Sequence, residues 1–193
     1  MTTHEHETET DDDPPIPDDL KARCARIELV IADVDGVLTD GRIVIDDRGV
    51  ETKNFHVRDG LGIALWRRAG GKSAIVSGRS AEVVARRAEE LKIDRLYQGI
   101  EDKGAALREL LEDLNLEPAQ VCYIGDDLID LPALLAVGLA ACPADAVAEV
   151  RRAAHLITRS AGGGGVVREV IETIMRARGL WRAVCERYGP PAM

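Results

Sequence analysis

The sequence of 193 residues lacks the features that mark membrane, secreted or zinc-binding proteins. No apolar run approaches the roughly 18 residues needed to cross a membrane. The acidic N-terminus has no basic region typical of a signal peptide. The four cysteines are far apart and form no CxxC pair, which favours reduced thiols over disulfides or zinc. We therefore expect a cytoplasmic protein with no membrane segment, whose single domain buries its core without disulfides.

The chain also lacks a surplus of basic residues. Its formal net charge is -9, but eight of its 34 acidic residues lie in residues 1–19, which contain no Lys or Arg. The other 26 acidic residues face 25 basic ones, so binding to nucleic acid would have no electrostatic support. We expect residues 1–22 to be a disordered acidic tail, residues 23–181 to form the folded domain, and residues 182–193 to be a flexible tail.

Short apolar runs alternate with amphipathic segments from about residue 27 onward. Helices are predicted over residues 60–69, from Ser80 to about Lys92, and after Asp102, with Ser80 and Asp102 as N-caps. A further helix follows the four glycines at 162–165, which we expect to act as a hinge. Strands are predicted at 27–34, 73–76, 121–124, 138–141 and 155–157. This alternation predicts an α/β fold with a Rossmann-like parallel sheet covered by helices on both faces.

One segment interrupts the alternation directly after the first predicted strand. Residues 42–46 and 50–55 flank the sequence DDRG, which predicts two strands joined by a tight turn. A β-hairpin at this point would project from the carboxyl edge of the sheet. Because an isolated hairpin is only marginally stable, we expect it to pack against another subunit.

Charged and polar residues follow the predicted strands or open the next helix. In a parallel sheet the carboxyl ends of the strands share one edge, where loops and helix N-termini meet. Crowded carboxylates repel one another unless they share a cation, and a hard divalent ion held by oxygen atoms fits Mg²⁺. The clusters are Asp33 and Asp35, then Ser77, Gly78 and Arg79, then Lys103, and finally Asp126, Asp127 and Asp130.

The chemistry that fits these residues is phosphoryl transfer. It requires a nucleophile, a proton donor and positive charge around the phosphate. Asp33 is the predicted nucleophile, and Asp35 is the predicted acid and then base. Further roles fall to Ser77 and Gly78 as phosphate contacts, Lys103 as the neutralising cation and Asp126 as a second metal-binding carboxylate. We expect Asp130 to support this site without ligation, whereas Asp127 either caps a helix start or acts directly.

The stretches DVDGVLTDG, SGR, the lysine of QGIEDK, and GDDLID resemble motifs one to four of the haloacid dehalogenase-like phosphatases. FHVRDGLGI, LYQG and AGGGGVVREV extend the similarity to the family of 3-deoxy-D-manno-octulosonate 8-phosphate (KDO 8-phosphate) phosphatases, over about residues 28–181. This resemblance implies a capless domain and a homotetramer. In such an assembly the hairpins associate, and a neighbour and the C-terminal tail partly close each active site.

The resemblance also implies an activity and a set of contacts. The activity is Mg²⁺-dependent hydrolysis of KDO 8-phosphate to KDO and phosphate through an aspartyl-phosphate, a step toward lipopolysaccharide. The implied metal ligands are Asp33, the Asp35 backbone carbonyl and Asp126. The implied substrate contacts are Asp35, His56, Val57, Arg58, Asp59, Gly60, Gly78, Arg79, Arg87 and Lys103.

Two departures from the family pattern leave alternatives open. Ala64 stands where an arginine is expected, and residues 162–165 read GGGG instead of GGRG. One alternative is therefore a phosphatase for another ulosonic acid phosphate, such as a nine-carbon 9-phosphate. The other is a tetrameric scaffold without catalysis, although such a protein should have lost Asp33 or Asp35. Without the resemblance, His56 and Arg87 would be read as solvent-facing residues.

Overall fold

The computed structural model describes residues 15–189, and the part of the predicted acidic tail in residues 1–14 lies outside them. A six-stranded sheet forms the centre of the molecule, with every neighbouring pair of strands parallel, as predicted. In spatial order its strands are β5 (Arg95–Tyr97), β4 (Lys72–Val76), β1 (Leu29–Ala32), β6 (Val121–Ile124), β7 (Leu139–Cys142) and β8 (Leu156–Ile157).

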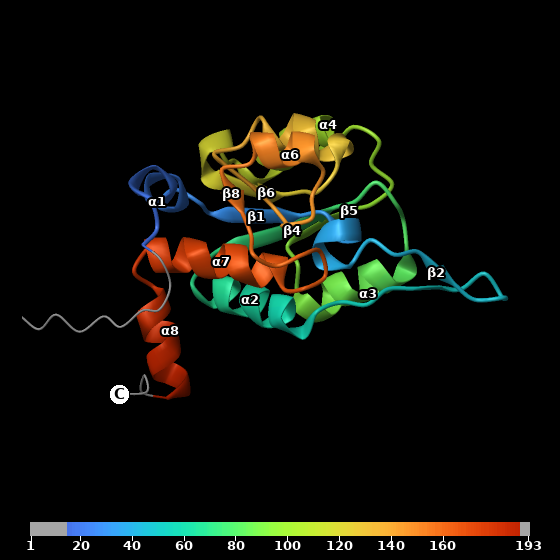
Figure 1. The fold of residues 1–193 in the computed structure, drawn as a ribbon, viewed down its shortest axis with the longest axis horizontal. Coiled ribbons are helices and arrows are strands. Elements are labelled where there is room, and N and C mark those ends of the chain that lie inside the picture. Colours follow the sequence, from blue (N-terminus) through green and yellow to red (C-terminus); the bar gives the residue numbers. More distant parts are fainter. Residues whose placement is uncertain (1–14, 190–193) are drawn as a thin grey trace, which may run out of the picture.

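Helices cover both faces of this sheet (Figure 1). One layer contains α2 (Val57–Arg68), α3 (Glu82–Leu91) and α7 (Val166–Ala177), and the other contains α4 (Lys103–Leu114), α5 (Leu131–Leu134) and α6 (Ala148–Ala153). Alternate residues of β1 enter two separate cores: Val30 and Ala32 face the first layer, whereas Leu29 and Ile31 face the second. The apolar side chains along one face of α7 are fully buried in the first core, namely Val166, Val167, Val170, Ile171, Ile174 and Met175.

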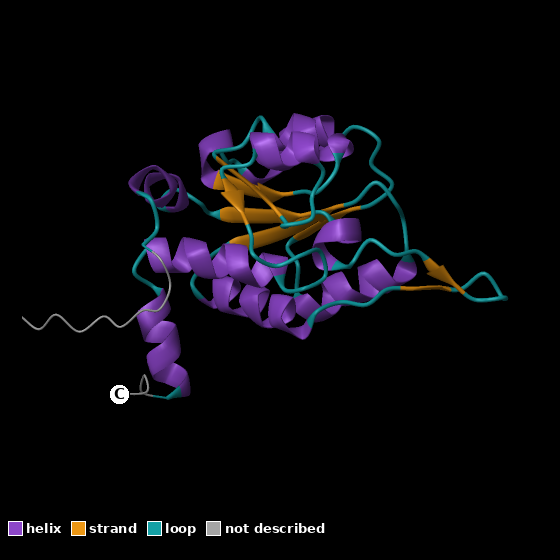
Figure 2. Cartoon of the chain, in the orientation of Figure 1, coloured by secondary structure: helices purple, strands orange, loops and turns teal. Residues whose placement is uncertain are grey.

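The predicted hairpin is present and projects from the body (Figure 2). Its strands β2 (Val44–Ile45) and β3 (Glu51–Thr52) are antiparallel and shorter than predicted. Gly49, with φ of 79°, closes the turn by donating its amide to the Asp46 carbonyl at 2.8 Å. Four apolar side chains on the hairpin are at least half exposed, namely Ile43, Val44, Ile45 and Val50.

Several predicted boundaries were wrong. Strand β5 was not predicted, because three residues with a single aliphatic side chain carry little periodic signal. Helix α2 begins at Val57, three residues before the predicted start, with His56 as its N-cap. Helix α3 begins at Glu82 with Ala81 as N-cap, so Ser80 does not cap it. Asp102 does cap α4, since its side chain accepts from the Ala105 amide at 2.9 Å.

Both predicted tails overlap with helices. Helix α1 (Asp18–Cys24) buries Leu20 and Cys24 in the first core, so ordered structure begins before residue 23. Helix α8 (Trp181–Tyr188) has all but its first residue in the segment predicted to be flexible, and that first residue, Trp181, is packed beneath two arginines of α7. Within the described residues, no helix is both long and apolar enough to span a bilayer.

Candidate active site

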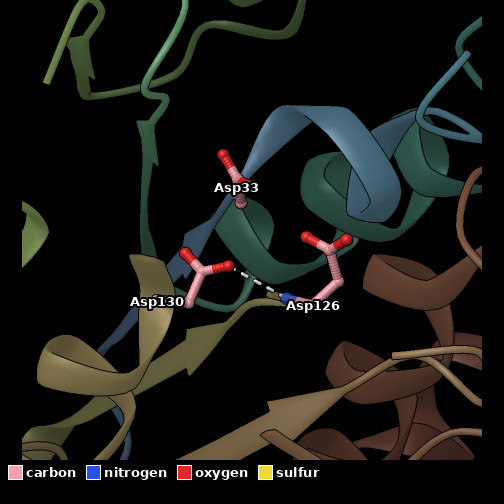
Figure 3. Close-up of side chains that lie close together, drawn as sticks. All are labelled: Asp33, Asp126 and Asp130. Atoms are coloured by element: carbon pink, nitrogen blue, oxygen red, sulfur yellow. Dashed lines mark hydrogen bonds between the residues drawn. The ribbon is translucent and has the colours of Figure 1, made fainter. Parts of the chain in front are cut away.

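The ends of two neighbouring strands bring three carboxylates together (Figure 3). Ala32 of β1 pairs with Ile124 of β6, so the residues that follow both strands emerge side by side. One carboxylate oxygen each from Asp33, Asp126 and Asp130 lies within 4.8 Å of the others. After β1, the chain forms β4 and β5 on one side of that strand and then crosses to form β6, β7 and β8 on its other side. Such a switch in strand order is where open α/β sheets bind ligands.

Glycine allows the two loops to approach this closely. Gly36 has a φ of 90°, and a Cβ atom there would lie 2.1 Å from Oδ2 of Asp126. A Cβ atom on Gly125 would lie 2.5 Å from Asp130. The Asp33 amide donates to the Ile124 carbonyl at 3.0 Å, which fixes the start of the first loop against β6. Side chains at these glycines would therefore push the carboxylates apart.

Lys103 and Asp130 form the buried base of the site. The Lys103 ammonium donates to Asp130 at 2.6 Å and lies 3.0 Å from Oδ1 of Asp33. Asp130 also accepts from the Tyr123 hydroxyl at 2.9 Å and from the Asp126 amide at 3.0 Å. Asp130 thus positions both Lys103 and the Asp126 loop. Asp127 is exposed and caps the following turn through the Leu128 amide at 2.7 Å.

Burial and like charge shape the protonation of this cluster. Burial, followed by the charge of Asp130, raises the pKa of Asp33 to about 6 against the opposing effect of Lys103. Burial and the charges of Asp33 and Asp130 raise the pKa of Asp126 to about 7. Burial alone would lower the pKa of Lys103, but Asp33 and Asp130 outweigh it and the pKa is raised. When all three carboxylates are ionised, the single ammonium of Lys103 therefore does not neutralise their charge.

Asp35 lies in a second ionic cluster beside the first. Its Oδ1 pairs with the ammonium of Lys53, and its Oδ2 lies 3.8 Å from Nε of Arg79. Glu51 joins both cations, at 3.0 Å from Lys53 and 3.2 Å from Arg79. Sequence analysis gave no role to Lys53 or Glu51, because both lie in a predicted hairpin where charged residues are usually solvated.

The predicted phosphate contacts lie at the end of β4. Ser77 is buried, and its hydroxyl oxygen accepts from the Arg79 amide at 3.3 Å. Gly78 is exposed beside it, and a Cβ atom there would make ordinary contact with Ile129 at 3.4 Å. These residues share the carboxyl edge of the sheet with Asp33, as the sequence predicts for residues that follow parallel strands.

The remaining predicted substrate contacts divide into two places. Arg87 and Val57 line a pocket of about 510 Å³ together with Phe55 and Lys53, and Lys53 pairs with Asp35. Gly60 packs under Arg87, since a Cβ atom there would lie 2.7 Å from its guanidinium. The pocket therefore combines apolar and cationic side chains with Glu90, which accepts from Arg87 at 2.8 Å.

The other group lies toward α7. His56 accepts from the Arg58 amide at 3.2 Å, and Arg58 lines a different pocket, of about 770 Å³, with Gly165 and Arg168. Asp59 is 2% exposed and accepts from the Arg168 amide at 2.8 Å. Asp59 therefore joins α2 to the beginning of α7.

The glycine segment packs against the loop that carries Asp35. The Gly163 amide donates to the Val37 carbonyl at 3.0 Å, and a Cβ atom on Gly162 would lie 2.2 Å from the Gly36 carbonyl oxygen. Asp145 accepts from the Gly162 amide at 2.9 Å. Close backbone approach accounts for these two glycines.

Comparison with known proteins identifies this arrangement. A family model described as haloacid dehalogenase-like hydrolase matches residues 95–170. The chain is 47% identical over 164 residues to the 3-deoxy-D-manno-octulosonate 8-phosphate phosphatase of Yersinia pestis, covering 85% of this chain and 88% of that protein. It is 44% identical over 165 residues to the same phosphatase of Escherichia coli strain K12, covering 86% and 88%.

A solved structure gives the same result. The crystal structure of the Moraxella catarrhalis phosphatase, in complex with magnesium ion, phosphate ion and KDO, matches with a TM-score of 0.86 at 39% identity, over 87% of this chain and 97% of that one. The fold and the order of the acidic residues thus define a haloacid dehalogenase-like hydrolase. Within that class, the chain belongs to the family of KDO 8-phosphate phosphatases.

Proposed function

We propose that this protein hydrolyses KDO 8-phosphate to KDO and phosphate through an aspartyl-phosphate on Asp33, with Mg²⁺ as cofactor. The observation that carries the proposal is the convergence of Asp33, Asp126 and Asp130 within 4.8 Å, with Lys103 beneath them. The family relationship supports both the chemistry and the substrate. The reaction belongs to the synthesis of lipopolysaccharide precursors.

The donor set fits magnesium. All the converging groups are hard oxygen donors, and Oδ1 of Asp126 is buried without a hydrogen-bond partner among the described residues. Asp33, Asp126 and the backbone carbonyl of Asp35 are the proposed ligands. Asp130 has both oxygens engaged by Lys103, Tyr123 and loop amides, so its role is support. Bound Mg²⁺ would supply positive charge to the phosphate and to Asp33.

The chain's own residues account for the remaining chemistry. A carboxylate oxygen of Asp33 forms a bond to phosphorus while the bond from phosphorus to the sugar oxygen breaks, and Asp35 donates the proton that this oxygen needs. Water then attacks the aspartyl-phosphate, Asp35 takes its proton, and the carboxylate of Asp33 is released with phosphate. Lys103 holds Asp33 and neutralises charge, while Ser77 and Gly78 contact phosphate oxygens.

The sugar acid end of the substrate would occupy the pocket that Arg87, Phe55 and Val57 line. A guanidinium suits a carboxylate, which assigns the acid group to Arg87 or Arg79. His56, Arg58, Asp59 and Gly60 stay predicted substrate contacts, of which Gly60 acts by leaving room for Arg87.

A phosphate-release assay over a set of sugar phosphates tests the function. We expect turnover of KDO 8-phosphate to exceed that of a nine-carbon ulosonic acid 9-phosphate and of simple hexose phosphates, and to disappear with EDTA and return with Mg²⁺. Equal slow turnover of every sugar phosphate would contradict the substrate assignment. Turnover that persists in EDTA would contradict the metal requirement.

We also propose that the protein is a cytoplasmic homotetramer assembled through its hairpins. Free thiols at all four cysteines suit a reducing compartment. The exposed apolar residues of the two-stranded hairpin suit a protein interface. Light scattering on a size-exclusion column should give the mass of four chains, and Val44→Glu should reduce it. A wild-type protein that elutes as a monomer at micromolar concentration would contradict this assembly.

A further inference from the structure

The side chain of Asp35 is held by a lysine that lies outside the four phosphatase motifs. Lys53 directly follows β3 of the hairpin, and its side chain is only 1% exposed. Its ammonium pairs with Oδ1 of Asp35 and with Glu51 at 3.0 Å. Arg79 donates to both oxygens of Glu51 at 3.2 Å and lies 3.8 Å from Oδ2 of Asp35. The four side chains thus form a closed ring of alternating charge.

Such a ring fixes the conformation of a side chain that its own loop holds weakly. Apart from Lys53 and Arg79, the described partner of the Asp35 carboxylate is the Thr39 hydroxyl at 3.5 Å. The ammonium of Lys53 has two carboxylate partners, Asp35 and Glu51, the latter at 3.0 Å. A buried ammonium is costly unless carboxylates compensate it, and here one of the two compensating carboxylates is Asp35.

We propose that Lys53 is a positioning residue for Asp35, through which the hairpin organises the active site of its own subunit. Lys53 and Thr39 both contact Oδ1, whereas Oδ2 lies 3.8 Å from Nε of Arg79. Oδ2 is therefore the oxygen that gives the proton to the leaving sugar oxygen and later takes one from water. This inference rests on the proposed function, because it assumes that Asp35 is the acid and base.

The leaving group separates the two steps in which Asp35 takes part. A sugar oxygen needs a proton as its bond to phosphorus breaks, so a displaced Asp35 slows the first step. The nitrophenolate of p-nitrophenyl phosphate leaves without a proton, so that first step persists. Hydrolysis of the aspartyl-phosphate needs Asp35 as base with either substrate. A displaced Asp35 therefore predicts rapid release of one nitrophenolate per site, followed by slow turnover.

The experiment compares Lys53→Met, Lys53→Arg and Lys21→Met in the full-length protein with Mg²⁺. Lys21 is an exposed lysine of α1 and provides a matched loss of charge away from the site. We expect Lys53→Met to lower kcat for KDO 8-phosphate about 10- to 100-fold. In stopped flow with p-nitrophenyl phosphate it should give the burst and then slow release. Lys53→Arg should recover most of the activity, and Lys21→Met should behave as wild type.

Several outcomes would overturn the inference. Wild-type kcat in Lys53→Met would do so, as would a parallel loss of burst and turnover in a variant whose circular dichroism is unchanged. An arginine variant no better than the methionine variant would exclude a role for the charge. If Lys53→Met does not fold, Glu51→Gln takes its place, because it removes the charge of one partner of Lys53. In that case, an unchanged kcat in Glu51→Gln together with an inactive Lys53→Arg would overturn the inference.

The proposed function itself can fail separately. A wild-type protein that does not release phosphate from KDO 8-phosphate would contradict the substrate assignment. The p-nitrophenyl phosphate burst in Lys53→Met would still report on the positioning of Asp35.

Discussion

Two places in the molecule bury a carboxylate where helices and loops meet. One is the strand-end corner that contains Asp33, which is 6% exposed, and the other is the joint between α2 and α7 that contains Asp59, which is 2% exposed. Burial is the largest cause in both cases and raises the pKa of each carboxyl to about 6. By burial and pKa alone, the two residues are indistinguishable.

Their surroundings differ. Asp33 faces Asp126 and Asp130 across a few ångströms and is paired with Lys103 at 3.0 Å. Asp59 accepts from the Arg168 amide at 2.8 Å, and its Oδ2 has no hydrogen-bond partner among the described residues. A raised pKa therefore does not mark the active site here. The convergence of several charged groups on one point does, because only that arrangement can bind a cation and a phosphate together.

The same substitution at both places should separate catalysis from structure. We expect Asp33→Asn to lower kcat by at least about 1,000-fold, because the amide cannot act as the nucleophile. Without metal, its melting temperature should equal or exceed that of wild type, since the change removes a buried charge while Lys103 keeps its pair with Asp130. Phosphate release and differential scanning calorimetry measure the two effects.

Asp59→Asn makes the same change at an equally buried carboxylate that takes no part in the bond-making steps. We expect its kcat to stay within a few-fold of wild type, with the loss of any substrate contact appearing in KM instead. Asp59 is also a predicted substrate contact, and this variant tests that prediction. An Asp33→Asn protein with more than a tenth of wild-type kcat would refute the nucleophile. Equal losses in both variants would remove the distinction between the two places.

The strand-end corner could be predicted from the sequence because local signals agree there. Apolar runs followed by Asp33, by Ser77 and by Asp126 indicate parallel strands that end in polar residues, and a parallel sheet brings such ends to one edge. The helix cap at Asp102 also fixes where Lys103 begins α4. Each of these predictions depends on a few adjacent residues.

The hairpin contacts and the helix joint could not be predicted in this way. Lys53 and Asp59 owe their burial to segments distant in sequence, Lys53 to the Asp35 loop and Asp59 to the start of α7. Nothing in the residues around Asp59 distinguishes a helix-capping carboxylate from a substrate contact. The glycines at 162–165 likewise suggested a hinge, whereas the packing of Gly162 against Gly36 depends on the tertiary fold.

Magnesium should stabilise the strand-end corner in a pH-dependent way. Asp33 and Asp126 have pKa values raised to about 6 and about 7 in the metal-free protein, so they become better ligands as pH rises through that range. At a Mg²⁺ concentration about 100-fold above Kd, we expect a stabilisation of about 2.7 kcal/mol at pH 8. At the same concentration and pH 5, the stabilisation should be much smaller.

Thermal unfolding with Mg²⁺ and with EDTA at each pH measures this linkage. Asp126→Asn is the control, because it removes a proposed ligand and should abolish most of the Mg²⁺ effect at pH 8. Equal stabilisation by Mg²⁺ at pH 5 and pH 8 would contradict the predicted pH dependence. A reduction of the Mg²⁺ effect in Asp59→Asn as large as that in Asp126→Asn would contradict the difference between the two places.

Asp59 should give a smaller effect on stability, which depends on pH. Its folded pKa of about 6 exceeds the ordinary value of 3.8, so the folded protein binds more protons than the unfolded chain between these values. The contribution of Asp59 therefore falls as pH rises, by about 2 kcal/mol between pH 4.5 and pH 7. In Asp59→Asn this component is absent, because the amide does not titrate.

Urea unfolding of both proteins in saturating Mg²⁺, at pH 4.5 and at pH 7, isolates that component. The free energy of unfolding of Asp59→Asn minus that of wild type should increase by about 2 kcal/mol between pH 4.5 and pH 7, because only wild type loses stability through this carboxyl. The absolute difference at one pH is less informative, since the new amide hydrogens also lack a partner in the buried joint. If the difference in the free energy of unfolding between Asp59→Asn and wild type stays constant with pH, Asp59 is ionised in the folded protein without cost. Asp59 would then not share the raised pKa of Asp33.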